Sequence, residues 1–250
     1  MPRSSLRDWL EEAPFTLALS SSFFGFFAHG GVAEGLRKAG FRPRRITGSS
    51  AGALVGGAIA SGLEPSETRD LLFGVKKRDF WDPAPGLGLL RGRKFLRIVE
   101  KNFVPTFSEA KLPFEAAVFD VLGCRTRFLS EGSLPRAVVA SCAVPLLFHP
   151  VRIGARVFVD GGVFHKSGIR LEHPADRTLC IFLQGDGLAD SYEWGRSFSR
   201  LGRNQRVLRF RNLPRVNYDS LEDGPAAYRE GKRRLLRALD LPSRGPILEA

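Results

Sequence analysis

The stretch that most constrains the fold is residues 46–60, ITGSSAGALVGGAIA, which contains the pattern GxSxG from Gly48 to Gly52. A β-branched pair precedes the pattern and small residues follow it, so the stretch predicts a strand, a sharp turn and a helix. Glycines two residues before and after Ser50 leave room for a strained backbone. Ser50 is therefore the candidate nucleophile. The helix starting at Ala51 would direct its free N–H groups at negative charge near the Ser50 oxygen.

Two strand–loop–helix units in succession indicate the class of fold. Residues 15–19 and 42–47 have the character of buried strands, and helical patterns follow them at 28–39 and 51–61. Such units predict an α/β fold with a mainly parallel central sheet and helices over its faces. The rest of the chain predicts helices at 5–12, 64–79, 94–103, 135–143 and 225–239, strands at 115–119, 125–129, 151–153, 156–159, 179–184 and 206–210, and a loop at 80–93 that we expect to cover the site.

Length and composition indicate one domain. With 250 residues and 43% hydrophobic content, the chain can build one large core, and nothing in its length requires a second. We therefore expect a single domain over residues 1–250, with its core at about 15–240. No internal repeat or low-complexity tract divides it.

The charge balance bears on the partners of the protein. Lys and Arg number 38 against 26 Asp and Glu, which leaves a net charge of +12. Such a charge favours anionic surfaces such as lipid headgroups or nucleic acid, and a solvated basic face explains it equally well. The sequence carries no RNP, helix-turn-helix or zinc-finger signature, so we expect no nucleic-acid partner. Peripheral contact with anionic membranes is the expected use of the charge.

Because no targeting segment is evident, we expect a cytoplasmic or membrane-peripheral protein. The start of the chain carries acids where a signal peptide needs an apolar core, so no signal peptide is expected. Residues 13–33 and 46–63 lack charged side chains, but turn formers interrupt both, and we expect buried core elements instead of transmembrane helices. Three cysteines without CxxC spacing, Cys124, Cys142 and Cys180, favour a reducing compartment and indicate no metal site.

A serine nucleophile needs a base, and two kinds of residue are available. Asp160 ends a predicted strand, and Gly161 and Gly162 after it let backbone and substrate approach closely. The same DGG is also an ordinary turn sequence. His165 and His173 are the alternative, as members of a Ser-His-Asp triad, although no third residue is evident to orient either one.

Three segments, in this order, resemble the patatin-like phospholipase family over about residues 15–239. They are LAL…AHGGV at 17–32, GSSAG at 48–52, and ASCAVPLLFHP at 140–150 leading into VDGG at 159–162. The resemblance implies a three-layer α/β/α sandwich with a mainly parallel central sheet, in which GxSxG forms a nucleophile elbow. It further implies a Ser-Asp dyad, with Ser50 as nucleophile and Asp160 as base, that acts on lipid or acyl-ester substrates without a metal or organic cofactor.

The loop at 20–27, SSSFFGFF, departs from the family pattern. Family members carry a glycine-rich stretch with an arginine there, whose backbone N–H groups form the oxyanion hole. In this chain Gly25 takes the place of the arginine and Phe26 that of the next glycine, so we expect a rebuilt or strained loop. Its phenylalanines either wall an acyl-chain pocket or belong to the core. The candidate oxyanion or substrate contacts are Ser21, Ser22, Phe23, Phe24, Gly25 and Ala51.

The sequence thus predicts a serine acyl hydrolase, a phospholipase A or lipid esterase, that forms an acyl-Ser50 intermediate. The alternative is a lipid- or acyl-chain-binding protein of the same fold with weak or no turnover. A third function, nucleic-acid binding, would rest on the charge alone.

Overall fold

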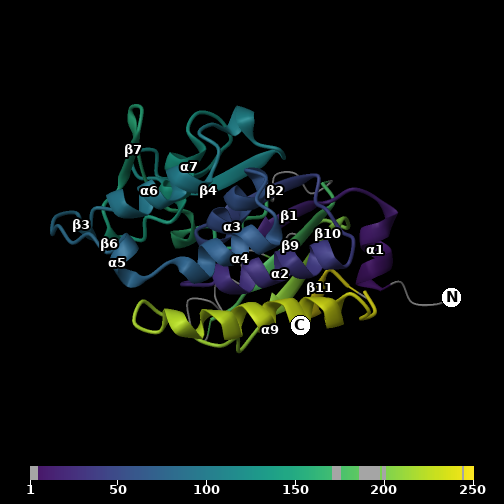
Figure 1. Ribbon diagram of the computed structural model, residues 1–250. Helices are drawn as coiled ribbons and strands as arrows, with labels where there is room; N and C mark the ends of the chain where they lie inside the picture. Colours follow the sequence, from purple (N-terminus) through teal and green to yellow (C-terminus); the bar gives the residue numbers. More distant parts are fainter. Residues whose placement is uncertain (1–4, 171–175, 186–197, 199–200, 244) are drawn as a thin grey trace.

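The computed structural model describes residues 5–250 except 171–175, 186–197, 199–200 and 244. Its centre is a nine-stranded sheet (Figure 1). The strands are β1 (Thr16–Leu19), β2 (Arg45–Ser49), β4 (Phe114–Asp120), β5 (Arg125–Leu129), β7 (Val151–Ile153), β8 (Arg156–Asp160), β9 (Thr178–Leu183), β10 (Gln205–Phe210) and β11 (Ile247–Glu249).

The sheet is parallel in its middle and antiparallel at one side. Its order is β11-β10-β9-β1-β2-β4-β8-β7, and β5 pairs with β4 outside this path. All pairs from β11 to β4 are parallel, whereas β4 pairs antiparallel with β5 and β8, and β7 with β8. Every residue of β1 and β9 is buried, which explains their nearly uniform apolar sequences. The predicted α/β fold with a mainly parallel sheet is confirmed.

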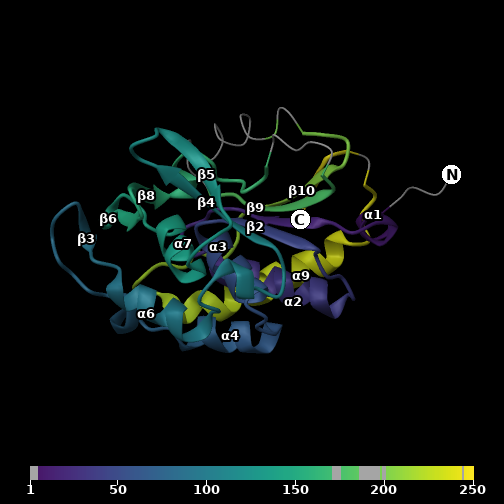
Figure 2. The ribbon, with the colours of Figure 1, turned by 90° about the horizontal axis from the view of Figure 1, so that it is seen from above.

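Helices pack against this sheet. They are α1 (Leu6–Glu12), α2 (Phe26–Lys38), α3 (Ala51–Ala60), α4 (Pro65–Gly74), α5 (Lys77–Phe80), α6 (Arg93–Asn102), α7 (Leu134–Ser141) and α9 (Gly224–Ala238). Figure 2 shows α2, α3, α4 and α9 together on one face. The backbones of α2 and α9 touch, since a Cβ at Gly31 would lie 1.9 Å from the Tyr228 carbonyl oxygen and one at Gly231 2.5 Å from that of Ala28.

Two local predictions are wrong. The helix expected at 64–79 is two helices, because Val75 and Lys76 are extended and a new helix begins where the Asp79 carboxylate accepts from the Lys76 N–H. The loop expected at 80–93 contains a short strand, β3 (Gly88–Leu90), which pairs in parallel with β6 (Leu146–Phe148). Nothing in the sequence of either strand predicts this pairing, because the two strands lie far apart in the chain.

The buried core extends past the expected limits of 15–240. Leu6, Trp9 and Leu10 of α1 are buried on one side of that range, and Leu248 of β11 on the other. Among the residues described, no helix has the length and apolar character needed to cross a bilayer. The two uncharged stretches form β1 with α2 and β2 with α3.

Candidate active site

Ser50 occupies a strained turn between β2 and α3. Its φ is 52° and its ψ is −117°, a backbone conformation that residues other than glycine rarely adopt. The Ser50 N–H donates to the Ser141 hydroxyl at 2.9 Å, and that hydroxyl donates to the Ala117 carbonyl oxygen at 2.6 Å. Ser141 therefore ties the turn to β4 and stabilises the strained conformation.

The two glycines of GxSxG are required by close backbone contacts. A Cβ at Gly52 would lie 2.1 Å from the Leu19 carbonyl oxygen, and one at Gly48 would lie 2.5 Å from the Gly52 carbonyl carbon. Both contacts are with backbone atoms, which cannot rotate away as a side chain can. The pattern thus has a steric origin that is independent of any chemistry at Ser50.

We expect Gly52→Ala to lower the free energy of unfolding by roughly 2–3 kcal/mol, because α3 must move away from β1 to admit the methyl group. Denaturant titration followed by circular dichroism measures the loss. Gly74→Ala is the matched control, since nothing lies within 4 Å of its Cβ. Alanine at that end of α4 should be neutral or slightly stabilising. Equal stability of the Gly52→Ala and Gly74→Ala variants would contradict the steric account.

The register of three neighbouring strands brings Asp160 to Ser50. Ser49 of β2 lies opposite Ala117 of β4, and the next residue of β4, Val118, lies opposite Asp160 of β8. The Ser50 hydroxyl donates to Asp160 Oδ2 at 2.6 Å. The two predicted residues, far apart in sequence, therefore form a direct hydrogen bond.

The glycines after Asp160 help to hold its carboxylate next to Ser50. The Gly162 N–H donates to Asp160 Oδ1 at 2.6 Å. A Cβ at Gly161 would lie 2.2 Å from the Ala117 carbonyl oxygen, and one at Gly162 would lie 2.1 Å from the Ser21 hydroxyl oxygen. The DGG segment thus forms a turn, and this turn packs closely against β4 and the loop after β1.

Burial makes Asp160 a stronger base than an ordinary aspartate. Its side chain is only 3% exposed, and desolvation raises its pKa to about 6 against the lowering effect of the hydrogen bonds from Ser50 and Gly162. At neutral pH the carboxylate is still mostly ionised. It can therefore accept the Ser50 proton.

The predicted alternative bases make other contacts. His165 Nε2 lies 2.7 Å from the Ile169 carbonyl oxygen, and its ring stands edge-on to Phe128. His173 lies outside the described residues. His149, which is not one of these two candidates, has its Nε2 2.7 Å from the Ala84 carbonyl oxygen.

A fourth histidine, which the sequence analysis did not assign, fixes the loop after β1. His29 of α2 is fully buried, and burial lowers its pKa to about 4, so the ring is neutral at physiological pH. Its Nε2 lies 2.8 Å from the Ser20 carbonyl oxygen, and a neutral ring meets a carbonyl there as an N–H donor. The sequence shows that His29 belongs to the AHGGV segment, but it does not show that the side chain is buried.

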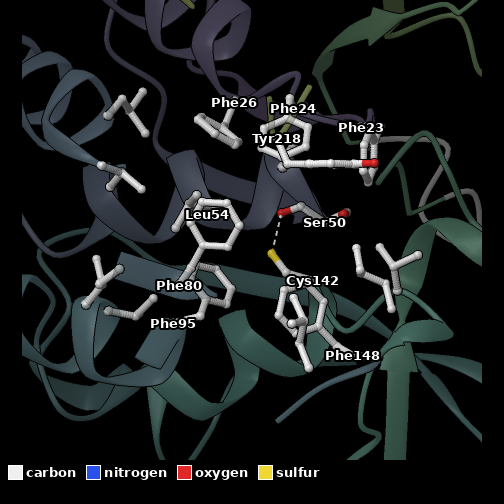
Figure 3. A pocket seen from close by; sticks show the side chains of 18 of the residues that line it. Phe23, Phe24, Phe26, Ser50, Leu54, Phe80, Phe95, Cys142, Phe148 and Tyr218 are labelled. Atoms are coloured by element: carbon white, nitrogen blue, oxygen red, sulfur yellow. Dashed lines mark hydrogen bonds between the residues drawn. The ribbon is translucent and has the colours of Figure 1, made fainter. Parts of the chain in front are cut away.

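An apolar pocket opens beside Ser50. Figure 3 shows Phe23, Phe24 and Tyr218 on one side of the serine and Phe80, Phe95 and Phe148 on the other. The lining comprises Ser22, Phe23, Phe24, Phe26, Ser50, Ala51, Leu54, Leu71, Leu72, Val75, Phe80, Trp81, Leu90, Phe95, Ile98, Val99, Phe103, Cys142, Val144, Leu147, Phe148 and Tyr218. Phe80, Trp81 and Leu90, which belong to the segment expected to cover the site, are among these lining residues.

The loop after β1 is strained, but at a different residue from the one expected. Phe26 is the first residue of α2, so it has helical geometry, and the positive φ of 52° falls on Phe24. Phe23, Phe24 and Phe26 line the pocket, whereas Phe27 is buried in the core. Three of the four phenylalanines thus line the pocket beside Ser50, and the fourth belongs to the core.

The six candidate oxyanion or substrate contacts divide into two groups. Ser22, Phe23, Phe24 and Ala51 line the pocket with Ser50. Ser21 and Gly25 are not among the lining residues: the Ser21 hydroxyl lies against Gly162 of the DGG turn, and Gly25 lies against Leu183.

Most of the far wall of the pocket was not predicted from the sequence. Phe95 and Val99 of α6 and Phe103 after it line the pocket. The amphipathic pattern of α6 indicates a buried face, but nothing in it reveals that this face meets Ser50. Cys142 also lines the pocket, and its thiol donates to the Ser50 carbonyl oxygen at 3.2 Å. In the described part of the chain, no three His, Cys, Asp or Glu side chains gather closely enough to hold a metal ion.

Comparison with known proteins identifies the family. The sequence model of the patatin-like phospholipase family matches residues 17–171. The chain belongs to this family. A strained serine elbow beside an apolar pocket is consistent with that membership.

Relatives with similar sequence come from mycobacteria. An uncharacterized NTE family protein of Mycobacterium tuberculosis is 31% identical over 180 residues, which are 68% of this chain and 49% of the relative. A second such protein from the same species is 32% identical over 165 residues, which are 63% of this chain and 28% of the relative. The chain therefore spans about half the length, or less, of these relatives.

The fold also matches a solved structure. VipD from Legionella pneumophila superposes with a TM-score of 0.62 over 90% of this chain and 67% of that chain, at 11% sequence identity. The likeness shows a shared patatin-like fold.

Proposed function

We propose that the protein is a serine acyl hydrolase that cleaves carboxylic ester bonds of lipids through an acyl-Ser50 intermediate. The observation that carries the proposal is the 2.6 Å hydrogen bond from the Ser50 hydroxyl to the buried Asp160 carboxylate, at the wall of an apolar pocket. Nucleophile and base then both come from the chain itself.

The reaction would proceed in two halves. Asp160 removes the proton from Ser50 Oγ as that oxygen bonds to the ester carbonyl carbon, and the protonated Asp160 then donates it to the departing alcohol. In the second half, water loses a proton to Asp160 and its oxygen attacks the acyl-Ser50 carbonyl carbon. The fatty acid leaves and the proton returns to Ser50.

The charge that develops on the ester oxygen needs N–H donors. Ala51 is the first residue of α3, so its N–H has no acceptor within the helix, and it lines the pocket beside Ser50. Ser22, Phe23 and Phe24 also line this pocket, so their backbone N–H groups are the further candidates. His29 would hold that loop in place through the Ser20 carbonyl oxygen.

The apolar lining of the pocket favours an acyl chain as the part of the substrate that binds there. Leucine, valine, isoleucine and phenylalanine side chains make up most of its lining, and no ionisable carboxylate or amine projects from the lining residues. Burial of methylene groups on such walls stabilises a bound acyl chain. The headgroup would then remain toward the solvent.

The test is hydrolysis of a nitrophenyl ester and of phosphatidylglycerol by the purified chain, with the rate followed against pH. We expect kcat/KM to fall on the acid side with a pKa of about 6, because protonation of Asp160 removes the base. Below that pH the rate should fall roughly tenfold for each unit. Full activity down to about pH 4, the range of an ordinary aspartate, would contradict the assignment.

A second candidate function is acyl-chain binding without turnover. It is favoured by Phe24, which holds a positive φ in a loop where the family has glycine, so that the N–H donors there are less free to adjust. Lipid binding without release of nitrophenol or fatty acid would support this second function over the first.

A further inference from the structure

Three leucines project from the segment that carries β3 and from its partner strand β6. We call residues 81–92 together with β6 the β3 arm. Leu87 is 77% exposed, Leu146 is 85% exposed, and Leu89 is also exposed. Figure 2 shows the segment with β3 looping out from the body of the molecule. Large apolar side chains so fully exposed on one small unit indicate an interaction surface.

The β3 arm is continuous with the pocket. Leu90 and Phe148, which lie opposite each other in the β3–β6 pair, both line the pocket. The two short strands therefore turn some side chains toward the path to Ser50 and others toward solvent. A surface that docks through Leu87 and Leu146 would place the pocket entrance next to whatever it docks on.

The arm holds its leucines outward by a tight and strained backbone. Leu146 has a φ of 68°, which is unfavourable for a branched aliphatic residue. A Cβ at Gly88 would lie 2.4 Å from the Phe148 carbonyl carbon, so the two strands touch closely. Such strain persists only where the surrounding structure enforces it, and here its effect is to direct a leucine into solvent.

Positive charge predominates in the sequence around the arm. Residues 76–101 contain eight Lys and Arg against three Asp and Glu, and of these cations Lys77 pairs with Asp219 and Arg78 with Asp79. Asp82, one of the three, is already engaged by the backbone N–H groups of Gly92 and Lys94. Arg93, Arg97 and Lys101 follow one another at four-residue intervals on α6 and have no acidic partner within the described ranges.

We propose that the β3 arm docks on an anionic lipid bilayer, with Leu87 and Leu146 inserted among the acyl chains and the α6 cations against the headgroups. Apolar side chains flanked by cations match the two layers of such a surface. A second copy of the chain is a poorer occupant, because two such faces would bring their unpaired cations together. The biological meaning rests on the proposed function, since docking here brings membrane esters to the pocket.

Binding of the Ser50→Ala protein to vesicles tests the proposal without any dependence on hydrolysis. The vesicles contain equal parts of phosphatidylglycerol and phosphatidylcholine, and cosedimentation gives the affinity. We expect Leu87→Asn with Leu146→Asn to weaken binding by roughly tenfold or more. Asparagine tolerates a positive φ, so the fold at Leu146 should be kept. Leu241→Asn is the control: its carbonyl oxygen accepts from Leu6 of α1, at the other end of the molecule in Figure 1.

A second pair of double variants tests how much the charge contributes to vesicle binding. Arg93→Gln with Arg97→Gln should weaken binding to the anionic vesicles and leave binding to pure phosphatidylcholine unchanged. The control is Arg42→Gln with Arg44→Gln, two exposed residues between α2 and β2, which should change neither. Wild-type affinity of the leucine double variant, or an equal loss from Leu241→Asn, would overturn the proposal. So would an absence of vesicle binding by the parent protein.

Hydrolysis separates this proposal from the proposed function. On the Ser50-containing background, the leucine double variant should keep wild-type kcat/KM on a dissolved short-chain ester and lose activity on vesicles. If the wild-type chain hydrolyses no ester, the proposed function fails while the vesicle-binding result still decides the docking surface.

Discussion

Replacement of Asp160 by asparagine is expected to lower kcat/KM for a short-chain nitrophenyl ester by roughly 10²–10⁴-fold, the usual contribution of a general base. The asparagine side chain has nearly the same shape and can still accept from the Gly162 N–H, but it cannot take the Ser50 proton. Steady-state rates of nitrophenol release measure the loss. Wild-type activity in Asp160→Asn would exclude the Ser-Asp mechanism.

Two controls test whether the loss of activity comes from the missing base and not from a loss of folded protein. His165→Ala should keep most of the activity, because the Ser50 hydroxyl donates to Asp160 and His165 Nε2 is directed at the Ile169 carbonyl oxygen. Thermal unfolding should show Asp160→Asn as stable as the wild type or more stable at pH 8. A folded-state pKa raised to about 6 means that ionised Asp160 opposes folding; the cost is absent below about pH 4 and develops fully above pH 6.

Ser50→Ala is expected to have the largest effect, a loss of at least about 10⁴-fold in ester hydrolysis, because no nucleophile remains to form the acyl intermediate. The apolar walls of the pocket do not change, so binding of a fatty acid should remain within a few-fold of the wild-type affinity. Displacement of a fluorescent fatty acid measures that binding. Residual hydrolysis above a tenth of the wild-type rate would show that another residue performs the attack.

The elbow was predictable because it depends on local sequence. Gly48 and Gly52 stand at positions where neighbouring backbone atoms leave no room for a Cβ. At Gly52 the atom in the way is the Leu19 carbonyl oxygen. Asp160 was found as the end of a strand, but its distance to Ser50 required the register of β4 between them. Strand order is a property of the whole sheet, and here only the family resemblance indicated it beforehand.

The pocket was predictable in part. The phenylalanines after β1 were recognised as candidates, yet their division between pocket and core depends on where α2 begins, which is Phe26 and not the predicted Ala28. The β3–β6 pair was not predicted. Its strands have three residues each and pair across the chain, so neither carries enough local pattern to be distinguished from a loop.

Activation of Ser50 by Asp160 is the central claim, and covalent labelling tests it most directly. A fluorophosphonate probe forms a bond from phosphorus to the attacking oxygen as fluoride leaves, and peptide mass spectrometry locates the adduct. We predict labelling of the wild type at Ser50, labelling at least tenfold slower in Asp160→Asn, and none in Ser50→Ala. A folded wild-type protein that remains unlabelled, or an Asp160→Asn variant labelled as fast as the wild type, would contradict the claim.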